Sequence, residues 1–421
     1  MRATQFLIAT QKETPSDAVV ISHSHIDHSG RVPLLAKQGY TGPVYTHEAS
    51  KALSEIMLPD SGYLNEKEAE WENKKRGRRG KLRVMPLYTR EDAEACIQQF
   101  VGLEYEAPIE IAPGLTLTLF DAGHILGSSI VQLVYDDNGS QRTLVFSGDL
   151  GYRDAPLMDP TTRLKQADAV VMESTYGDRN HRPIGETLEQ LTAVFEAARA
   201  AHGNVLIPAF TVGRTQDLLY LMAEHQEAWG LRDWNVFLDS PMGISATKVY
   251  SRYRNLFAAQ LFEPKSDYPE LPNLYATRSV EESMAINEME SGAIIIAGSG
   301  MCTGGRIRHH FKHNLWRRNA HVVIVGYQAI GTPGRALVDG ARTYRIGGEK
   351  IAVNATIHTL GGFSAHASQS QLIDWASNFN EPHPELYLIH GEEEAKLTLQ
   401  KSFAERGWSA EIPGSGESIQ F

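Results

Sequence analysis

The stretch His23-Ser24-His25-Ile26-Asp27-His28 decides how this chain is interpreted, because it places three imidazoles and a carboxylate within six residues. It follows the apolar run 18–21, whose composition predicts a buried strand. A strand end followed by a short loop can hold such side chains around a metal ion. A catalytic zinc takes three protein ligands and keeps one position open, so this loop indicates two ions. The alternative is a surface cluster of histidines that bind no metal.

Length and composition indicate a globular protein of two domains. The chain has 421 residues, 42% of them hydrophobic. No segment approaches the roughly 20 apolar residues of a membrane span, and Met1 to Thr10 lacks a signal-peptide pattern, so we expect a cytoplasmic protein outside membranes. Cys96 and Cys302 are too few for a disulfide framework or a sulfur-ligated zinc site. The net charge of −11 argues against nonspecific coating of nucleic acid, but a local basic groove is compatible with it.

Apolar runs of strand length alternate with helical patterns, which predicts an α/β fold. Thr89 and the three residues after it have the composition of a helix start, and Glu186 to Ala201 carries apolar residues at helical spacing. Between Leu115 and Phe146 short turns join the strands, which indicates an antiparallel meander. The predicted strands are 18–21, 115–120, 143–146, 169–172, 204–207, 236–238, 293–297, 321–325 and 386–389.

Five more acidic or imidazole side chains lie at or just after predicted strand ends. His124 and Asp149 stand in glycine-containing turns, where the backbone can approach an ion closely. Glu173 and His390 each follow an apolar run directly, and His366 lies in a short polar turn. Each of these side chains alone would suit a structural role. Together they predict one common site.

The whole pattern resembles the metallo-β-lactamase superfamily, in its β-CASP branch of zinc-dependent ribonucleases. The resemblance runs from about Asp17 to the C-terminus and includes Ser174-Thr175-Tyr176-Gly177-Asp178-Arg179 and Phe363-Ser364-Ala365-His366, segments characteristic of this branch. It is similar to compact bacterial and archaeal relatives of the endonuclease that cuts pre-mRNA 3′ ends. The resemblance implies an α/β fold in which an αββα sandwich, residues 1–177 and 365–421, carries an inserted β-CASP domain, residues 178–364. Active sites in this family lie in the cleft between the two domains.

The resemblance also implies a role for each site residue. One zinc ion would be held by His23, His25 and His124, a second by Asp27, His28 and His390, and Asp149 would bridge the two. Histidine at position 390 is typical of members that cut RNA. The implied catalytic residues are Asp27, His366 as the general acid, and Glu173, which orients His366.

The implied reaction is hydrolysis of phosphodiester bonds in single-stranded RNA, with two zinc ions and with 5′ phosphate and 3′ hydroxyl products. Endonuclease and 5′ exonuclease modes both fit the resemblance, which also implies a homodimer. A small-molecule metallohydrolase would share the zinc cluster but would not explain Glu173, His366 and the inserted domain. A non-catalytic RNA-binding subunit is the other alternative, and the complete ligand set argues against it.

The amino terminus departs from the family pattern. Family members have about two or three strands and an Asp-Cys-Gly turn before the histidine motif, whereas Met1 to Ser16 stand there in this chain. Gln5 to Thr10 could supply one strand. We therefore expect the first strands of the sandwich to be shortened or missing, with an exposed sheet edge.

Cationic segments are the candidates for substrate contacts. The segment from Lys74 to Arg83 holds seven cations and no acid, which suits a phosphate backbone or, alternatively, a solvated charged face. A glycine-rich stretch, 298–305, has backbone amides that could bind an anion. The predicted substrate-binding residues are Lys74, Lys75, Arg76, Arg214 and Arg306. The alternative for Arg214 is a helix-start arginine bonded to a nearby carboxylate. None of these residues reads bases, so we expect RNA binding by charge and shape.

Overall fold

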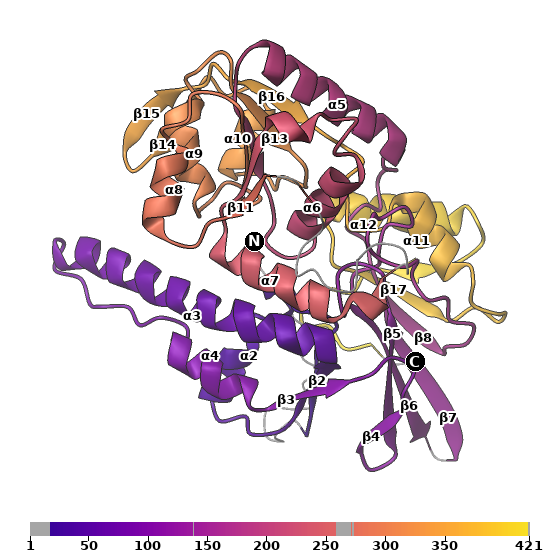
Figure 1. Cartoon of the computed structure of the whole chain (residues 1–421). Helices are drawn as coiled ribbons and strands as arrows, with labels where there is room; N and C mark the ends of the chain where they lie inside the picture. The colour runs from indigo at the N-terminus through magenta and orange to yellow at the C-terminus, as the bar shows by residue number, and fades with distance from the viewer. Residues whose placement is uncertain (1–16, 138, 258–270, 272, 420–421) are drawn as a thin grey trace. The chain divides into compact units, whose positions relative to one another are not determined.

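A computed structural model describes residues 17–137, 139–257, 271 and 273–419, which fold into two compact units (Figure 1). The first unit contains the chain up to Arg153, Pro160–Asn180 and the chain from His366. The second contains Asp154–Asp159 and His181–Ala365. The strand predicted at Gln5 to Thr10 lies outside the described residues. The domain boundaries after residues 177 and 364 remain predictions from sequence.

Two β-sheets form the centre of the first unit. The smaller sheet has the parallel order β1 (Val19–Val20), β2 (Val44–His47), β3 (Phe100–Leu103). The larger has the order β18-β17-β8-β7-β6-β5-β4, antiparallel from β4 to β7, which includes the meander predicted between Leu115 and Phe146, and parallel from β7 to β18. Its strands are β4 (Ile109–Ala112), β5 (Leu115–Asp121), β6 (Ser129–Asp137), β7 (Ser140–Phe146), β8 (Ala169–Glu173), β17 (Glu385–Ile389) and β18 (Ala410–Glu411).

Alternating side chains explain why helices cover both outer faces of this sandwich. In β8, Ala169 and Val171 point into the core between the sheets, while Val170 and Met172 point to the opposite layer. That opposite layer is formed by α11 (Gln369–Ala376) and α12 (Glu393–Ala404). Helices α2 (Val32–Lys37), α3 (Glu48–Gly77) and α4 (Arg90–Ile97) cover the small sheet. This αββα layering confirms the predicted fold class.

The second unit is a parallel sheet with helices on both faces. In β9, Val205 and Ile207 face one helical layer and Leu206 faces the other, as a fully buried parallel strand requires. The sheet order is β11-β10-β12-β9-β13-β16. Its strands are β9 (Val205–Pro208), β10 (Asn235–Leu238), β11 (Leu274–Ala276), β12 (Ala293–Ala297), β13 (His321–Ile324) and β16 (Thr356–Thr359), and β14 (Thr343–Ile346) pairs with β15 (Glu349–Ala352) in a separate hairpin.

The helices of the second unit divide between the two faces of its sheet. One face is packed by α5 (Ile184–Ala200), α6 (Arg214–Glu224), α7 (Pro241–Arg252) and the short turn η1 (Leu231–Asp233), and the other by α8 (Val280–Ile286), α9 (Ile307–Asn314) and α10 (Pro333–Val338). A second short turn, η2, spans Arg254–Leu256. Helix α5 confirms the helical pattern predicted from Glu186, and Thr89 caps α4 together with Asp92. Within the described ranges, no helix is both long and apolar enough to span a membrane.

Candidate metal centre

The candidate site is assembled from loops at strand ends of the first unit. Asp149, Glu173 and His390 lie at the carboxyl ends of β7, β8 and β17, which are parallel neighbours, so the three side chains share one edge of the sheet. His124 follows β5. The loop between β1 and the short helix α1 (Ile26–Ser29) brings His23 and His25 to the same place, and α1 itself carries Asp27 and His28.

Glycines let the loops of Asp149 and His124 pack against each other. Gly148 has φ of +57°, a conformation that favours glycine, and a Cβ there would lie 2.6 Å from the Ser129 carbonyl oxygen. A Cβ at Gly151 would overlap the backbone of Gly123. Substitution at either glycine would therefore push the Asp149 loop away from its neighbours.

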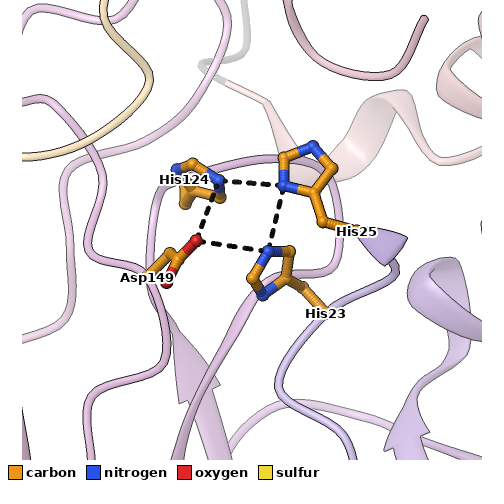
Figure 2. Close-up of side chains that lie close together, drawn as sticks. All are labelled: His23, His25, His124 and Asp149. Atoms are coloured by element: carbon orange, nitrogen blue, oxygen red, sulfur yellow. Dashed lines mark hydrogen bonds and ion pairs between the residues drawn. The ribbon is translucent and has the colours of Figure 1, made fainter. Parts of the chain in front are cut away.

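Three histidines and Asp149 form the first group of possible ligands (Figure 2). His25 Nδ1 lies 3.1 Å from His23 Nε2 and 3.3 Å from His124 Nε2. Asp149 Oδ2 lies 3.5 Å from His23 Nε2 and 3.6 Å from His124 Nε2. A tetrahedral zinc with ligands at about 2.0 to 2.2 Å has ligand-to-ligand edges of about 3.3 to 3.6 Å. Three of the four distances drawn in Figure 2 fall in this range, and the fourth, 3.1 Å between His23 and His25, is shorter than it by about 0.2 Å.

A second group lies on the other side of Asp149 and consists of Asp27, His28 and His390. Asp27 Oδ2 lies 3.7 Å from His390 Nε2 and 3.9 Å from His28 Nε2. Asp149 also faces this group, with Oδ2 3.3 Å from His28 Nε2 and Oδ1 3.5 Å from His390 Nδ1. Asp149 Oδ1 is buried and has no hydrogen-bond partner among the described residues. A buried carboxylate oxygen without a hydrogen bond is suited to binding a cation.

The charges of the cluster also suit metal binding. Burial lowers the pKa of His23 and His25 and so favours the neutral imidazole, the form that binds metal. The Asp149 carboxylate raises the pKa of His390 to about 10 despite partial burial. The protonated ring thus supplies positive charge that the carboxylates need, and a bound cation would supply the same charge and release the proton.

Glu173 and His366 form a pair beside these two groups. Glu173 is 1% exposed, and its Oε1 accepts a hydrogen bond of 2.6 Å from the Leu150 amide. His366 Nδ1 lies 3.2 Å from both carboxylate oxygens of Glu173 and 3.9 Å from Asp149 Oδ2. Burial alone would lower the pKa of His366, but Glu173 and Asp149 outweigh it and raise that pKa. Glu173 therefore fixes the ring and favours its protonated form.

Three hydroxyl side chains that sequence analysis did not single out support the site. Ser147 Oγ accepts the Glu173 amide at 3.0 Å, Ser22 Oγ lies 3.1 Å from His23 Nδ1, and Thr175 Oγ1 lies 3.2 Å from His390 Nδ1. All three stand in the same strand-end loops as the ligands. Their proximity to the ligands in the sequence was the available signal.

Two of the predicted substrate-binding residues, Arg214 and Arg306, lie in the second unit and already have protein partners. Arg214 is 5% exposed, begins α6, and donates to Asp217 Oδ2 at 2.9 Å, which is the alternative considered from sequence. Arg306 donates to Asp239 Oδ1 at 2.6 Å and to the Arg278 carbonyl oxygen. Both arginines therefore have structural contacts, and a role in substrate binding remains a prediction.

The other predicted substrate contacts differ in accessibility. In the glycine-rich stretch the amides of Ser299, Cys302 and Gly304 donate to acceptors within the loop itself. Lys74, Lys75 and Arg76 lie in the last turn of α3, and both lysines are exposed. Arg76 is half-buried and donates from Nε to the Leu82 carbonyl oxygen at 2.6 Å.

Comparison with known proteins identifies the family. Models of three families match the chain, described as "Beta-lactamase superfamily domain" over residues 2–207, "Beta-Casp domain" over 215–337 and "Zn-dependent metallo-hydrolase RNA specificity domain" over 350–413. Ribonuclease TTHA0252 of Thermus thermophilus is 36% identical over 96% of this chain and 88% of its own length. The chain belongs to the β-CASP branch of the metallo-β-lactamase superfamily. The family inferred from sequence is confirmed, and with it the assignment to metal-dependent hydrolases.

Archaeal β-CASP proteins are also similar to this chain. Transcription termination factor FttA of Pyrococcus abyssi is 31% identical over 97% of this chain and 62% of its own length. FttA of Methanocaldococcus jannaschii is 31% identical over 90% of this chain and 58% of its own length. The chain thus spans about three fifths of the length of these archaeal β-CASP relatives.

Proposed function

We propose that this β-CASP protein is a zinc-dependent ribonuclease that hydrolyses phosphodiester bonds of single-stranded RNA and leaves 5′ phosphate and 3′ hydroxyl ends. The supporting observation is that seven possible zinc ligands and the Glu173–His366 pair converge at one sheet edge. The similarity to a ribonuclease over 96% of the chain and the match to an RNA specificity domain support RNA as the substrate.

The two ligand groups would hold two zinc ions per chain. His23, His25 and His124 would hold one ion, Asp27, His28 and His390 the other, and Asp149 would contact both. Zinc bound there would supply a hydroxide nucleophile at neutral pH and neutralise charge on the phosphodiester. Asp149 is 2% exposed and lies within 3.6 Å of ligand nitrogens from both groups, which is why we assign it as the bridge.

His366 would supply the proton that the departing 3′ oxygen needs. Its Nδ1 faces Glu173, so the proton would be donated from Nε2. Glu173 holds the ring in place and is itself fixed, because the amides of Leu150 and Thr175 donate to its two oxygens. Asp27 is the most exposed group of the cluster, at 45%, and would complete the second zinc site next to the reacting phosphate.

The direct test is cleavage by zinc-loaded protein whose metal content has been measured. Single-stranded RNA labelled at the 5′ end or internally, and DNA of the same sequence, are incubated with and without a chelator. We expect chelator-sensitive cleavage of RNA and little cleavage of DNA, with 5′ phosphate ends on the products. Internal fragments would indicate endonuclease action, and release of labelled mononucleotides would indicate a 5′ exonuclease.

Two results would contradict the proposal. Protein with two zinc ions and no cleavage of RNA would show that the metal centre serves another substrate. Cleavage that persists in the chelator after zinc has been removed would show that the ligand cluster is not the catalytic centre.

A further inference from the structure

We infer that the end of α3 and the segment that follows it bind single-stranded RNA outside the metal centre. We call residues 63–87 the basic arm. The inference rests on the proposed function in one respect, namely that RNA is the substrate, and it names a binding site for that substrate separate from the catalytic groups.

The basic arm is an ordered projection of the first unit. Helix α3 has 30 residues, which corresponds to about 45 Å, and it extends past α4 (Figure 1). Asn73 both donates to the Val84 carbonyl oxygen and accepts from the Val84 amide, at 2.8 Å each. The hydrogen bond from Arg76 Nε to the Leu82 carbonyl oxygen joins the end of α3 to the segment that follows it. These bonds hold the returning segment alongside the helix, so its cations are presented on a fixed scaffold.

The charge of the arm is opposite to that of the molecule. Seven cations and no acid occupy residues 74–83, in a chain with a net charge of −11. Lys74, Arg78 and Arg79 are exposed and have no acidic partner among the described residues. A solvated helix face normally mixes both signs, as α3 does earlier, where Lys67 pairs with Glu70. Unneutralised cations held together favour a polyanion as the partner.

An exposed aromatic ring lies next to these cations. Trp71 is 58% exposed, and the Lys75 ammonium lies 3.0 Å from the centroid of its ring. Tyr63 is 46% exposed on the same helix. Proteins that bind single strands combine cations for the phosphates with aromatic rings on which bases stack. The arm offers both within one helical turn, which favours single-stranded RNA over a duplex.

Exposed aliphatic side chains on the arm require that a protein partner be tested as well. Leu82 is 87% exposed and Met85 is 83% exposed. Such side chains contribute little to RNA binding but would suit an apolar surface of another protein or of a second copy of this chain. Trp71→Leu distinguishes RNA binding from protein binding. Leucine can still make an apolar contact with a protein, but it lacks the ring on which a base would stack.

The experiment measures binding of a labelled single-stranded RNA of about 20 nucleotides to full-length, zinc-loaded protein in the His366→Ala background, with the RNA checked for integrity afterwards. The variants are Trp71→Leu, Trp71→Phe and the triple replacement of Lys74, Arg78 and Arg79 by Gln. The matched control replaces three cations of α12 and its end, Lys396, Lys401 and Arg406, by Gln. Circular dichroism and sedimentation velocity establish folding and oligomeric state for each protein.

We expect the triple arm variant to bind RNA about 10-fold more weakly and to lower the slope of log Kd against log salt by about 2, since each contact with a single-strand phosphate contributes about 0.7. Trp71→Leu should weaken binding about 10-fold, with a smaller loss for Trp71→Phe. The α12 control should have the same affinity for RNA and the same slope of log Kd against log salt as the protein with an unaltered arm. This result would establish the arm as an RNA-binding site.

Unchanged affinity and salt slope in the triple variant would overturn the inference, and a simultaneous loss of self-association would assign the arm to protein contacts instead. The same measurements distinguish an error in the inference about the arm from an error in the proposed function. If the wild type cleaves RNA but the arm variants bind like the control, only the inference about the arm is wrong. If the wild type does not cleave RNA but binds it through the arm, the inference holds and the catalytic proposal is wrong.

Discussion

The role of His366 in catalysis can be tested separately from metal binding. Its Nδ1 faces Glu173 at 3.2 Å, whereas the three histidines of Figure 2 face one another. His366→Ala should therefore keep close to two zinc ions per chain while RNA turnover falls about 100-fold to 10,000-fold, the usual contribution of a general acid. Zinc analysis and single-turnover cleavage test this prediction.

His383→Ala is a suitable control for that experiment, because His383 belongs to the same unit and stacks on Trp408 away from the ligand groups. It should retain both zinc and turnover. Normal turnover in His366→Ala would remove His366 from the mechanism, and loss of zinc would show that it acts as a ligand.

Replacement of Asp149, unlike replacement of His366, should affect zinc binding. It lies within 3.6 Å of His23, His28 and His124, so its removal affects both ligand groups. Asp149→Ala should lose most of its zinc as well as its cleavage activity, since neither group keeps its shared carboxylate. Isothermal titration with zinc and cleavage assays measure both effects. Retention of two tightly bound ions would disprove the bridging role.

Asp239 connects several elements of the second unit. It follows β10, is fully buried, and accepts hydrogen bonds from Thr277, Ser283, Arg306 and His310, which link it to α8 and α9. Burial alone would raise the pKa of Asp239, but these bonds outweigh it and hold the pKa at about 2. Because the native pKa lies below the unfolded value of 3.8, the ionised group stabilises the unit above about pH 4.

Asp239→Asn should therefore lower the free energy of unfolding by about 2 kcal/mol at neutral pH, since one pKa unit corresponds to about 1.4 kcal/mol. The difference from the wild type should shrink as the pH falls from about 4 to about 2, where Asp239 itself becomes protonated. Urea unfolding of both proteins across this range measures the difference. A difference that stays constant with pH would show that the Asp239 charge does not contribute to stability.

Elements with strong local patterns could be predicted from the sequence, whereas those that depend on distant partners could not. All nine predicted strands are present, because each has apolar side chains, continuous or alternating, that fill a core on at least one face. Helix α3 was not specified, since Pro59 and Gly62 interrupt its pattern, and both are buried. Strand β1 pairs only with β2 in the described residues and is shorter than its apolar run.

In the candidate site, too, residues with a local sequence pattern could be predicted, whereas contacts with distant partners could not. Its ligand residues stand out as a set, because many histidines and carboxylates together follow strand ends, although each of them alone would suit a structural role. Arg214 and Arg306 were less predictable, because their partners, Asp217 and Asp239, become evident only once the helices and strands are packed. Gly-rich composition likewise suggested an anion-binding loop between residues 298 and 305, while the structure shows several of its amides bonded within the loop.

At the scale of the whole molecule, zinc should stabilise one unit and not the other. All seven proposed zinc ligands belong to the first unit, and each unit has hydrophobic clusters of its own. With free zinc at about 100 times its dissociation constant, the first unit should gain about 2.7 kcal/mol, or about 5 to 10 °C in its unfolding temperature. Calorimetry should then show one transition that moves with zinc and one that does not. Asp149→Ala should abolish the shift, magnesium should not reproduce it, and equal movement of both transitions would contradict independent unfolding of the units.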